Sequence, residues 1–139
     1  MTNLVTHSIK IKVKPEHIDD MNHVNNVVYL QWIQDVAISH WVTEASQEWQ
    51  DKYQWVALRH EIDYKKPAFL EDELIAETSV AEMSGVKSVR LTRIYNESTN
   101  QTLVESKTNW CQIDALTKRP KRIEQEMIDQ YIKREASGI

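Results

Sequence analysis

The sequence predicts an α+β domain in which one long helix lies on a face of an antiparallel sheet. A strand-like segment is followed by a long segment of helical periodicity and then by four consecutive strand-like segments. Successive strands pair most simply in antiparallel fashion, and the helix must bury its apolar face against them. No linker, repeat or low-complexity tract interrupts the 139 residues, so we expect a single domain over residues 1–139.

The first strand is predicted by strict alternation. Ile9, Ile11 and Val13 alternate with lysines. This period of two, with β-branched residues on one side, is typical of a half-buried strand. Pro15 ends the strand because it has no N–H to donate to a ladder.

A long helix follows a polar segment at residues 16–26. Either Asn25 or Asn26 stands where an N-cap is expected, before the first apolar turn. The helical period continues to about Glu44, which predicts a helix more buried than a typical surface helix. Its apolar face consists of Tyr29 or Leu30, Ile33, Val36, Ala37, His40 and Trp41.

The remaining chain predicts four strands and a short helix. The strands cover residues 55–64, 74–80, 86–95 and 103–113, with a turn at Ser84-Gly85 and another over residues 96–100. Beyond Pro120, residues 123–132 predict a short amphipathic C-terminal helix. Five strands and one long helix leave sheet edges and one sheet face open, which favours a homodimer or homotetramer.

Composition excludes several classes of function. The net charge of −4 argues against nucleic-acid binding, and two glycines are too few for a phosphate-binding loop. No apolar run reaches the roughly 20 residues that span a bilayer, and the first residues lack the pattern of a signal peptide. Together with a single cysteine, Cys111, these features predict a cytoplasmic protein without a membrane partner.

A dense polar cluster lies just before the long helix. Residues 17–26 contain two carboxylates, two imidazoles and three carboxamides. Unpaired N–H groups at a helix N-terminus can stabilise an oxyanion, and a carboxylate there can act as nucleophile or as base for water. His23 could orient or protonate a reacting group. Asp19 could instead cap a turn, and His17, Asp19 and His23 could surround a metal ion.

These residues resemble a known signature. Asp19-Asp20-Met21-Asn22-His23-Val24-Asn25-Asn26, followed by Tyr29, resembles the D-x-x-x-H-V-N-N-x-x-Y signature of hotdog-fold thioesterases. The resemblance is to 4-hydroxybenzoyl-CoA thioesterase-like acyl-CoA thioesterases, with a related form in acyl-carrier-protein thioesterases. It extends to residues 61–68, Glu61-Ile62-Asp63-Tyr64-Lys65-Lys66-Pro67-Ala68, which resemble the family's second strand and its Tyr-x-x-Pro turn, and to residues 113–120, and so covers nearly the whole chain. It implies a hotdog fold, in which a five-stranded sheet wraps around the central helix.

The resemblance also implies a role for each matching residue. Asp19 matches the catalytic carboxylate, and the backbone N–H of Asn26 matches the donor that polarises the thioester carbonyl. His23 and Asn25 flank that site, and Tyr29 packs behind it. Contacts to the pantetheine or nucleotide of the substrate are expected from Ser84, Gly85, Val86, Lys87 and Ser88.

Three positions depart from the family pattern. Asn22 stands where many members have Gly, and His17 stands where many have Asp. Met21 stands where the carrier-protein enzymes have a catalytic Asn, which leaves Asp19 as the main candidate for catalysis.

The implied activity is hydrolysis of an acyl-CoA to a free acid and coenzyme A, with no cofactor and no metal. The alternatives are a non-catalytic module that binds acyl thioesters, an acyl-carrier-protein thioesterase and a hotdog dehydratase.

The basic clusters Lys65-Lys66 and 118–122 are either solvated surface or attract the phosphates of coenzyme A. His40 and His60 are interpreted as structural, and Cys111 as a buried strand residue.

Overall fold

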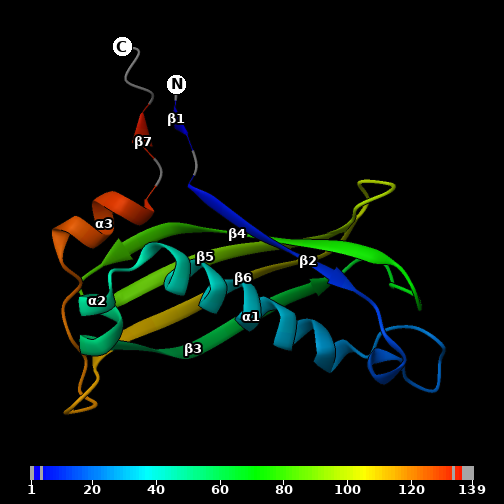
Figure 1. Ribbon diagram of the computed structural model, residues 1–139, viewed down its shortest axis with the longest axis horizontal. Helices are drawn as coiled ribbons and strands as arrows, with labels where there is room; N and C mark the ends of the chain where they lie inside the picture. Colours follow the sequence, from blue (N-terminus) through cyan, green and yellow to red (C-terminus); the bar gives the residue numbers. More distant parts are fainter. Residues whose placement is uncertain (1, 4, 133, 136–139) are drawn as a thin grey trace.

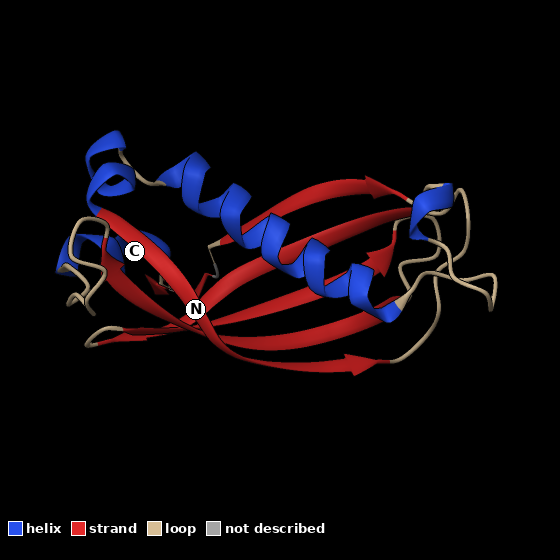
Figure 2. Cartoon of the chain, turned by 90° about the horizontal axis from the view of Figure 1, so that it is seen from below, coloured by secondary structure: helices blue, strands red, loops and turns tan. Residues whose placement is uncertain are grey.

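One antiparallel sheet and one long helix make up most of the structure. The computed structural model describes residues 2, 3, 5–132, 134 and 135. Helix α1 (Asn26–Glu44) lies against the sheet, and Figure 2 shows the strands curving around one side of it. The strand order is β2-β4-β5-β6-β3, with every neighbouring pair antiparallel. The strands are β2 (Thr6–Lys12), β3 (Tyr53–Tyr64), β4 (Glu73–Ser84), β5 (Lys87–Asn96) and β6 (Thr102–Asp114). This arrangement confirms the predicted hotdog fold.

Helix α1 begins and ends where the sequence predicts. Asn25, one of the two predicted caps, accepts a hydrogen bond from the backbone N–H of Val27 at 3.0 Å. The N–H of Ala45 closes the last turn on the carbonyl of Trp41 at 2.8 Å. The helix is well buried for its length, because Trp32 and five residues of the predicted apolar face are buried: Tyr29, Ile33, Val36, Ala37 and His40.

Two apolar clusters hold the helix on the sheet. The first lies under the N-terminal half of α1, where Tyr29, Trp32 and Ile33 pack with Leu74 and Ile94 of the central strands. The second includes Trp49, Val80, Met127 and Tyr131 and brings together the short helices α2 (Gln47–Lys52) and α3 (Gln125–Tyr131). Helix α3 is the predicted C-terminal helix.

Several short elements were not expected from the sequence. Residues 46–54, between the predicted helix and the strand predicted at residues 55–64, contain helix α2, and Ser46 caps it by accepting from the N–H of Trp49 at 3.1 Å. A helix of six residues is too short to show a period, so the sequence pattern does not predict it. The 3₁₀ helix η1 (Pro15–His17) and the pair β1 (Thr2–Asn3) with β7 (Arg134–Glu135) are also additional.

The two ends of the sheet carry different features. The loop between β2 and α1 lies at one end, and the β4–β5 turn lies at the other, near α2 and α3 (Figure 1). Twelve residues of β4 separate these ends, which corresponds to about 40 Å of strand. In the described part of the chain, no helix is long and apolar enough to cross a membrane.

Candidate active site

The polar segment before α1 forms a tight loop. Ile18 bridges to Val24, the N–H of Asp19 donates to the carbonyl of His23 at 3.1 Å, and the N–H of Asn22 donates to the carbonyl of Asp19 at 3.0 Å. The Asp19 side chain is half-buried inside this loop, whereas the neighbouring Asp20 is exposed. The two adjacent carboxylates therefore have different surroundings.

The carboxylate of Asp19 takes part in the turn through one oxygen. Its Oδ1 atom accepts a hydrogen bond from the N–H of Met21 at 2.9 Å. None of the hydrogen bonds of the described residues uses Oδ2. The turn-capping role and a catalytic role are therefore compatible, because one oxygen holds the loop and the other is free to meet a substrate or a water molecule.

Asn22 explains one departure from the family pattern. Its φ of 64° lies in the left-handed region, where glycine is the usual residue. Asparagine tolerates this conformation better than other residues with a side chain. The Asn22 backbone therefore has the shape that a glycine would have at this turn.

The N-terminus of α1 opens directly from this loop. The N–H of Asn25 donates to the carbonyl of His17 at 3.0 Å, and its side chain caps the helix. The N–H of Asn26 has no acceptor among the described residues, as is usual for the first helical residue. The Tyr64 hydroxyl donates to the carbonyl of Asn26 at 3.3 Å, which ties the helix start to the end of β3.

A second loop supports the first from behind. The N–H of Val24 donates to the carbonyl of Ala68 at 2.9 Å, and the N–H of Ala68 donates to the Tyr29 hydroxyl at 3.0 Å. Tyr29 is only 2% exposed, and burial raises the pKa of its hydroxyl. It therefore packs behind the site as a neutral anchor. The His23 ring lies edge-on to Phe69 at 6.4 Å, and its buried Nδ1 has no hydrogen-bond partner in the described residues.

The structure does not gather His17 with Asp19 and His23 into a metal site. His17 Nδ1 accepts from the N–H of Lys14 at 2.9 Å, and the ring lies edge-on to Trp32 at 5.1 Å. Within residues 2, 3, 5–132, 134 and 135, no three His, Cys, Asp or Glu side chains are arranged to hold a metal ion. The metal interpretation has no support in this geometry.

The predicted contacts at residues 84–88 lie at the opposite end of the sheet. Gly85 occupies the β4–β5 turn with a φ of 64°, and Lys87 is exposed beside it. The Gly85 carbonyl accepts from the N–H of Ile123 at 2.8 Å, which brings the basic segment 118–122 to the same end. Within one chain, Ser84, Gly85, Val86, Lys87 and Ser88 are therefore remote from Asp19.

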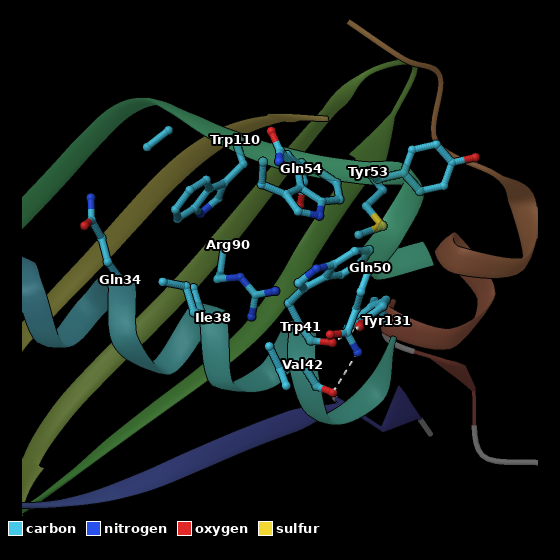
Figure 3. Close-up of a pocket in the computed structure, with 15 residues that line it drawn as sticks. Gln34, Ile38, Trp41, Val42, Gln50, Tyr53, Gln54, Arg90, Trp110 and Tyr131 are labelled. Atoms are coloured by element: carbon cyan, nitrogen blue, oxygen red, sulfur yellow. Dashed lines mark hydrogen bonds between the residues drawn. The ribbon is translucent and has the colours of Figure 1, made fainter. Parts of the chain in front are cut away.

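A cavity of about 550 Å³ lies between the C-terminal half of α1 and the inner faces of β3, β5 and β6. Figure 3 shows the Arg90 guanidinium among its lining side chains, between Trp110 and Trp41. The polar lining includes Gln34 and Ser88, and the apolar lining includes Ile38, Val42, Trp55 and Tyr131. The sequence does not single out Arg90, because alternation along a strand does not tell which face of the strand turns inward.

Arg90 is tied to the helix through a buried histidine. Its Nη1 donates to His40 Nδ1 at 2.8 Å and to Thr78 Oγ1 at 3.2 Å. Desolvation by burial, together with the charge of Arg90, lowers the pKa of His40 to about 3. The imidazole is therefore neutral at physiological pH and acts as the acceptor, in agreement with the interpretation of His40 as a structural residue.

The sheet order and the central helix are those of the hotdog class of thioester hydrolases. The family model of the thioesterase-like superfamily matches residues 13–131, and the chain belongs to this family.

Individual relatives agree with this assignment. The chain is 25% identical over 129 residues to the long-chain acyl-CoA thioesterase FadM of Escherichia coli (strain K12), which covers 89% of this chain and 98% of that protein. The crystal structure of YbaW, a probable thioesterase from Escherichia coli, has a TM-score of 0.76 at 25% identity and covers 89% of this chain and 95% of that one. The protein SAV2348 from Staphylococcus aureus, solved in complex with CoA, has a TM-score of 0.81 at 15% identity, over 91% of this chain and 82% of that one, and shows the likeness of fold.

Proposed function

We propose that this thioesterase hydrolyses acyl-CoA, and that Asp19 and the N-terminus of α1 carry the reaction. The main support for the proposal is the position of the Asp19 carboxylate, whose Oδ2 forms no hydrogen bond with the described residues. Its loop leads directly into the start of α1, where the Asn26 N–H has no acceptor among the described residues. A carboxylate beside such a donor suits attack on a carbonyl whose oxygen becomes negative. FadM, a relative by sequence, is named as a long-chain acyl-CoA thioesterase.

Two routes use the same groups. In the first, Asp19 attacks the thioester carbonyl, the C–S bond breaks, and the thiolate of coenzyme A takes a proton. Water then cleaves the resulting anhydride and restores the carboxylate. In the second, Asp19 removes a proton from water, which attacks the carbonyl and expels the thiol. In both routes the Asn26 N–H stabilises the oxyanion, and His23 lies in the loop as a proton donor or as a positioning residue.

The active unit that we propose is a homodimer joined along β3. Strand β3 is one edge of the sheet and exposes Val56 and Leu58, whereas the other edge, β2, presents the charged side chains of Lys10 and Lys12. Lysines on an edge strand discourage further pairing, and an apolar edge invites it. Two copies of β3 related by a two-fold axis would pair antiparallel and continue the sheet. Two such dimers can pair again into a tetramer.

This pairing would complete the substrate site. Antiparallel alignment sets the Tyr64 end of one β3, next to Asn26, beside the Tyr53 end of the other. The Tyr53 end lies with the basic cluster, since Lys118 Nζ donates to Gln54 Oε1 at 2.7 Å. The second copy would therefore bring Lys87 and its own basic segment toward the Asp19 loop. Those charges suit the phosphates of coenzyme A.

The surface next to Asp19 also fits a partner and an acyl thioester. Met21 and Val27 are 72% and 71% exposed, and Phe69 and Leu70 from the supporting loop are about half exposed. Grouped apolar side chains of this size on a surface indicate a binding region.

Release of free thiol from a panel of acyl-CoAs tests the proposal directly. The panel should contain short, long and aromatic acyl groups, with the matching acyl carrier protein thioesters in parallel. Turnover of at least one acyl-CoA, with the free acid as product, is the expected result. Tight binding of acyl-CoA without turnover at any chain length would contradict it and favour a non-catalytic module. Turnover confined to carrier-protein thioesters would replace coenzyme A by the carrier protein.

A further inference from the structure

The cavity between α1 and the sheet is lined by a buried arginine that has N–H groups without an acceptor in the described residues. The guanidinium of Arg90 has five N–H groups, and among the described residues only those of Nη1 find acceptors, in His40 and Thr78. The indole Nε1 of Trp110 is buried and has no partner in the described residues. Both side chains line the cavity (Figure 3). An occupant that offers acceptor oxygens would satisfy the remaining N–H groups of Arg90.

The cavity also holds a positive charge without a counter-charge. Arg90 is only 7% exposed, and none of the ion pairs of the described residues includes it. No Asp or Glu is among the lining residues. Burial lowers the pKa of Arg90 to about 10, so the guanidinium remains protonated at neutral pH. An uncompensated buried charge is costly, and an anionic occupant would offset that cost.

We propose that this cavity selects acyl groups that end in a carboxylate, which Arg90 binds through its free N–H groups. A carboxylate matches the planar guanidinium with two parallel hydrogen bonds and cancels its charge. The indoles of Trp41, Trp55 and Trp110 line the remaining wall and suit the methylene chain that leads to the carboxylate. A neutral terminal group would satisfy the donors but leave the charge uncompensated.

The size and position of the cavity suit this use. About 550 Å³ lies within the usual range for small-molecule sites. Along α1, the nearest lining residue, Gln34, lies eight positions from Asn26, which corresponds to about 12 Å of helix. His40, which contacts Arg90, lies fourteen positions from Asn26, or about 21 Å along the helix. The inference therefore concerns mono-thioesters of long linear diacids, with the thioester at one end and the carboxylate at the other.

The inference rests on the proposed function, and matched substrate pairs test it. Suberyl-, sebacyl-, dodecanedioyl- and hexadecanedioyl-CoA are compared with octanoyl-, decanoyl-, dodecanoyl- and hexadecanoyl-CoA, which have equal chain lengths. For at least one length, kcat/KM should be about 10- to 100-fold higher with the terminal carboxylate, as expected for a charge-assisted hydrogen-bonded pair. Equal or lower values with the carboxylate at every length overturn the inference, while hydrolysis of the methyl-terminated substrates leaves the proposed function standing.

Binding of the free acids separates the two proposals. Calorimetric titration with suberate and with octanoate requires no hydrolysis. Suberate should bind more tightly than octanoate even in Asp19→Asn, where turnover is lost. If no acyl-CoA is hydrolysed but suberate still binds preferentially, the proposed function fails and the cavity assignment stands. If neither acid binds, the cavity assignment fails.

Two arginines of the same strand supply a matched control. Arg90→Met should abolish the preference for the carboxylate, and Arg90→Lys should reduce it. Arg93 lies on the opposite face of β5, with its guanidinium 4.1 Å from the ring of Tyr95. Arg93→Met removes the same charge and should leave the preference unchanged. Loss of the preference in both methionine variants would assign the effect to net charge and overturn the role of the cavity. If Arg90→Met does not fold, the substrate pairs and the acid titrations with the wild-type protein decide whether the cavity binds the carboxylate.

Discussion

Arg90 fixes the tautomer of His40, because its Nη1 group donates a hydrogen bond to His40 Nδ1 over 2.8 Å. A guanidinium has donors only, so Nδ1 carries no hydrogen and the imidazole hydrogen lies on Nε2. The ring is also stacked on His7 at 5.2 Å and lies edge-on to Tyr131 at 5.0 Å. One buried contact therefore links the central helix, the sheet and the wall of the cavity.

This contact predicts that the protein loses stability in acid. His40 has a pKa of about 3 in the folded protein, well below its ordinary value of 6.5, because it is buried and faces Arg90. Unfolded chains take up a proton on His40 below pH 6.5, whereas folded chains do not until about pH 3. The contribution of His40 to the free energy of unfolding is therefore fully present above pH 6.5. As the pH falls from 6.5 toward 3, this contribution is lost at up to about 1.4 kcal/mol per pH unit.

Urea unfolding between pH 7.5 and pH 4.5 measures this slope. His40→Gln removes the titrating group and should give a shallower loss of the free energy of unfolding over the same interval, even if it is less stable at pH 7.5. Identical slopes for the wild type and His40→Gln would show that the buried imidazole is not linked to folding.

Most of the fold could be predicted because its long elements carry clear periods. The alternation in β2, the helical face of α1 and the turn residues at Ser84-Gly85 fixed the order and type of these elements. Helix α2 was missed because six residues do not reveal a period, and its buried Trp49 resembles any surface-loop tryptophan in sequence. Pairing between β1 and β7 joins segments from the two ends of the chain, which no local pattern indicates.

The candidate site could be predicted only where it is local in sequence. Asp19, His23, Asn25 and Asn26 belong to one continuous loop, so a motif describes their proximity directly. The cavity is different, because Arg90 meets His40 and Trp110 only after three elements have folded together. The separation of residues 84–88 from Asp19 is likewise a property of strand length and sheet order.

Assembly along β3 gives the second prediction. Light scattering at micromolar concentration should give a mass at least twice the 16.4 kDa of the chain. The double variant Val56→Glu with Leu58→Glu should shift the protein toward monomers, because like charges would face each other across the two-fold axis. Leu91→Glu changes an exposed leucine of the central strand β5 and should keep at least the dimer. A stable wild-type monomer would rule out the shared sheet.

The basic cluster gives the third prediction. Neutralising Lys87 and Lys121 to Gln should raise KM for acyl-CoA more than it lowers kcat, since these residues would bind the substrate and its transition state equally. The effect should shrink at high salt, because exposed charges are screened over about 8–10 Å at moderate ionic strength. Lys107→Gln, an exposed lysine in the middle of β6, is the matched control and should leave KM unchanged. An unaltered KM for the double variant at low salt would return the cluster to solvated surface.

The Asp19 carboxylate gives the last prediction. Asp19→Asn removes the negative charge but keeps an oxygen that can accept from the Met21 N–H, so the loop should keep its shape. General-base catalysis contributes about 10²–10⁴ in rate, and loss of a nucleophile can cost more. We therefore expect kcat to fall at least about 100-fold with the folded structure and the oligomeric state unchanged. His23→Ala should cost less if the imidazole only holds the loop, and a comparable amount if it transfers a proton.

Asp20→Asn is the control that separates chemistry from charge. Asp20 is adjacent in sequence but exposed, and it forms no hydrogen bond through its side chain within the described residues. Its variant should keep near-native kcat, because the loss of one negative charge from the loop surface alters neither the turn nor the helix N-terminus. Loss of activity in Asp20→Asn with activity retained in Asp19→Asn would move the catalytic carboxylate by one residue. Retained activity in both would mean that the helix N-terminus and water suffice, and the carboxylate mechanism would be abandoned.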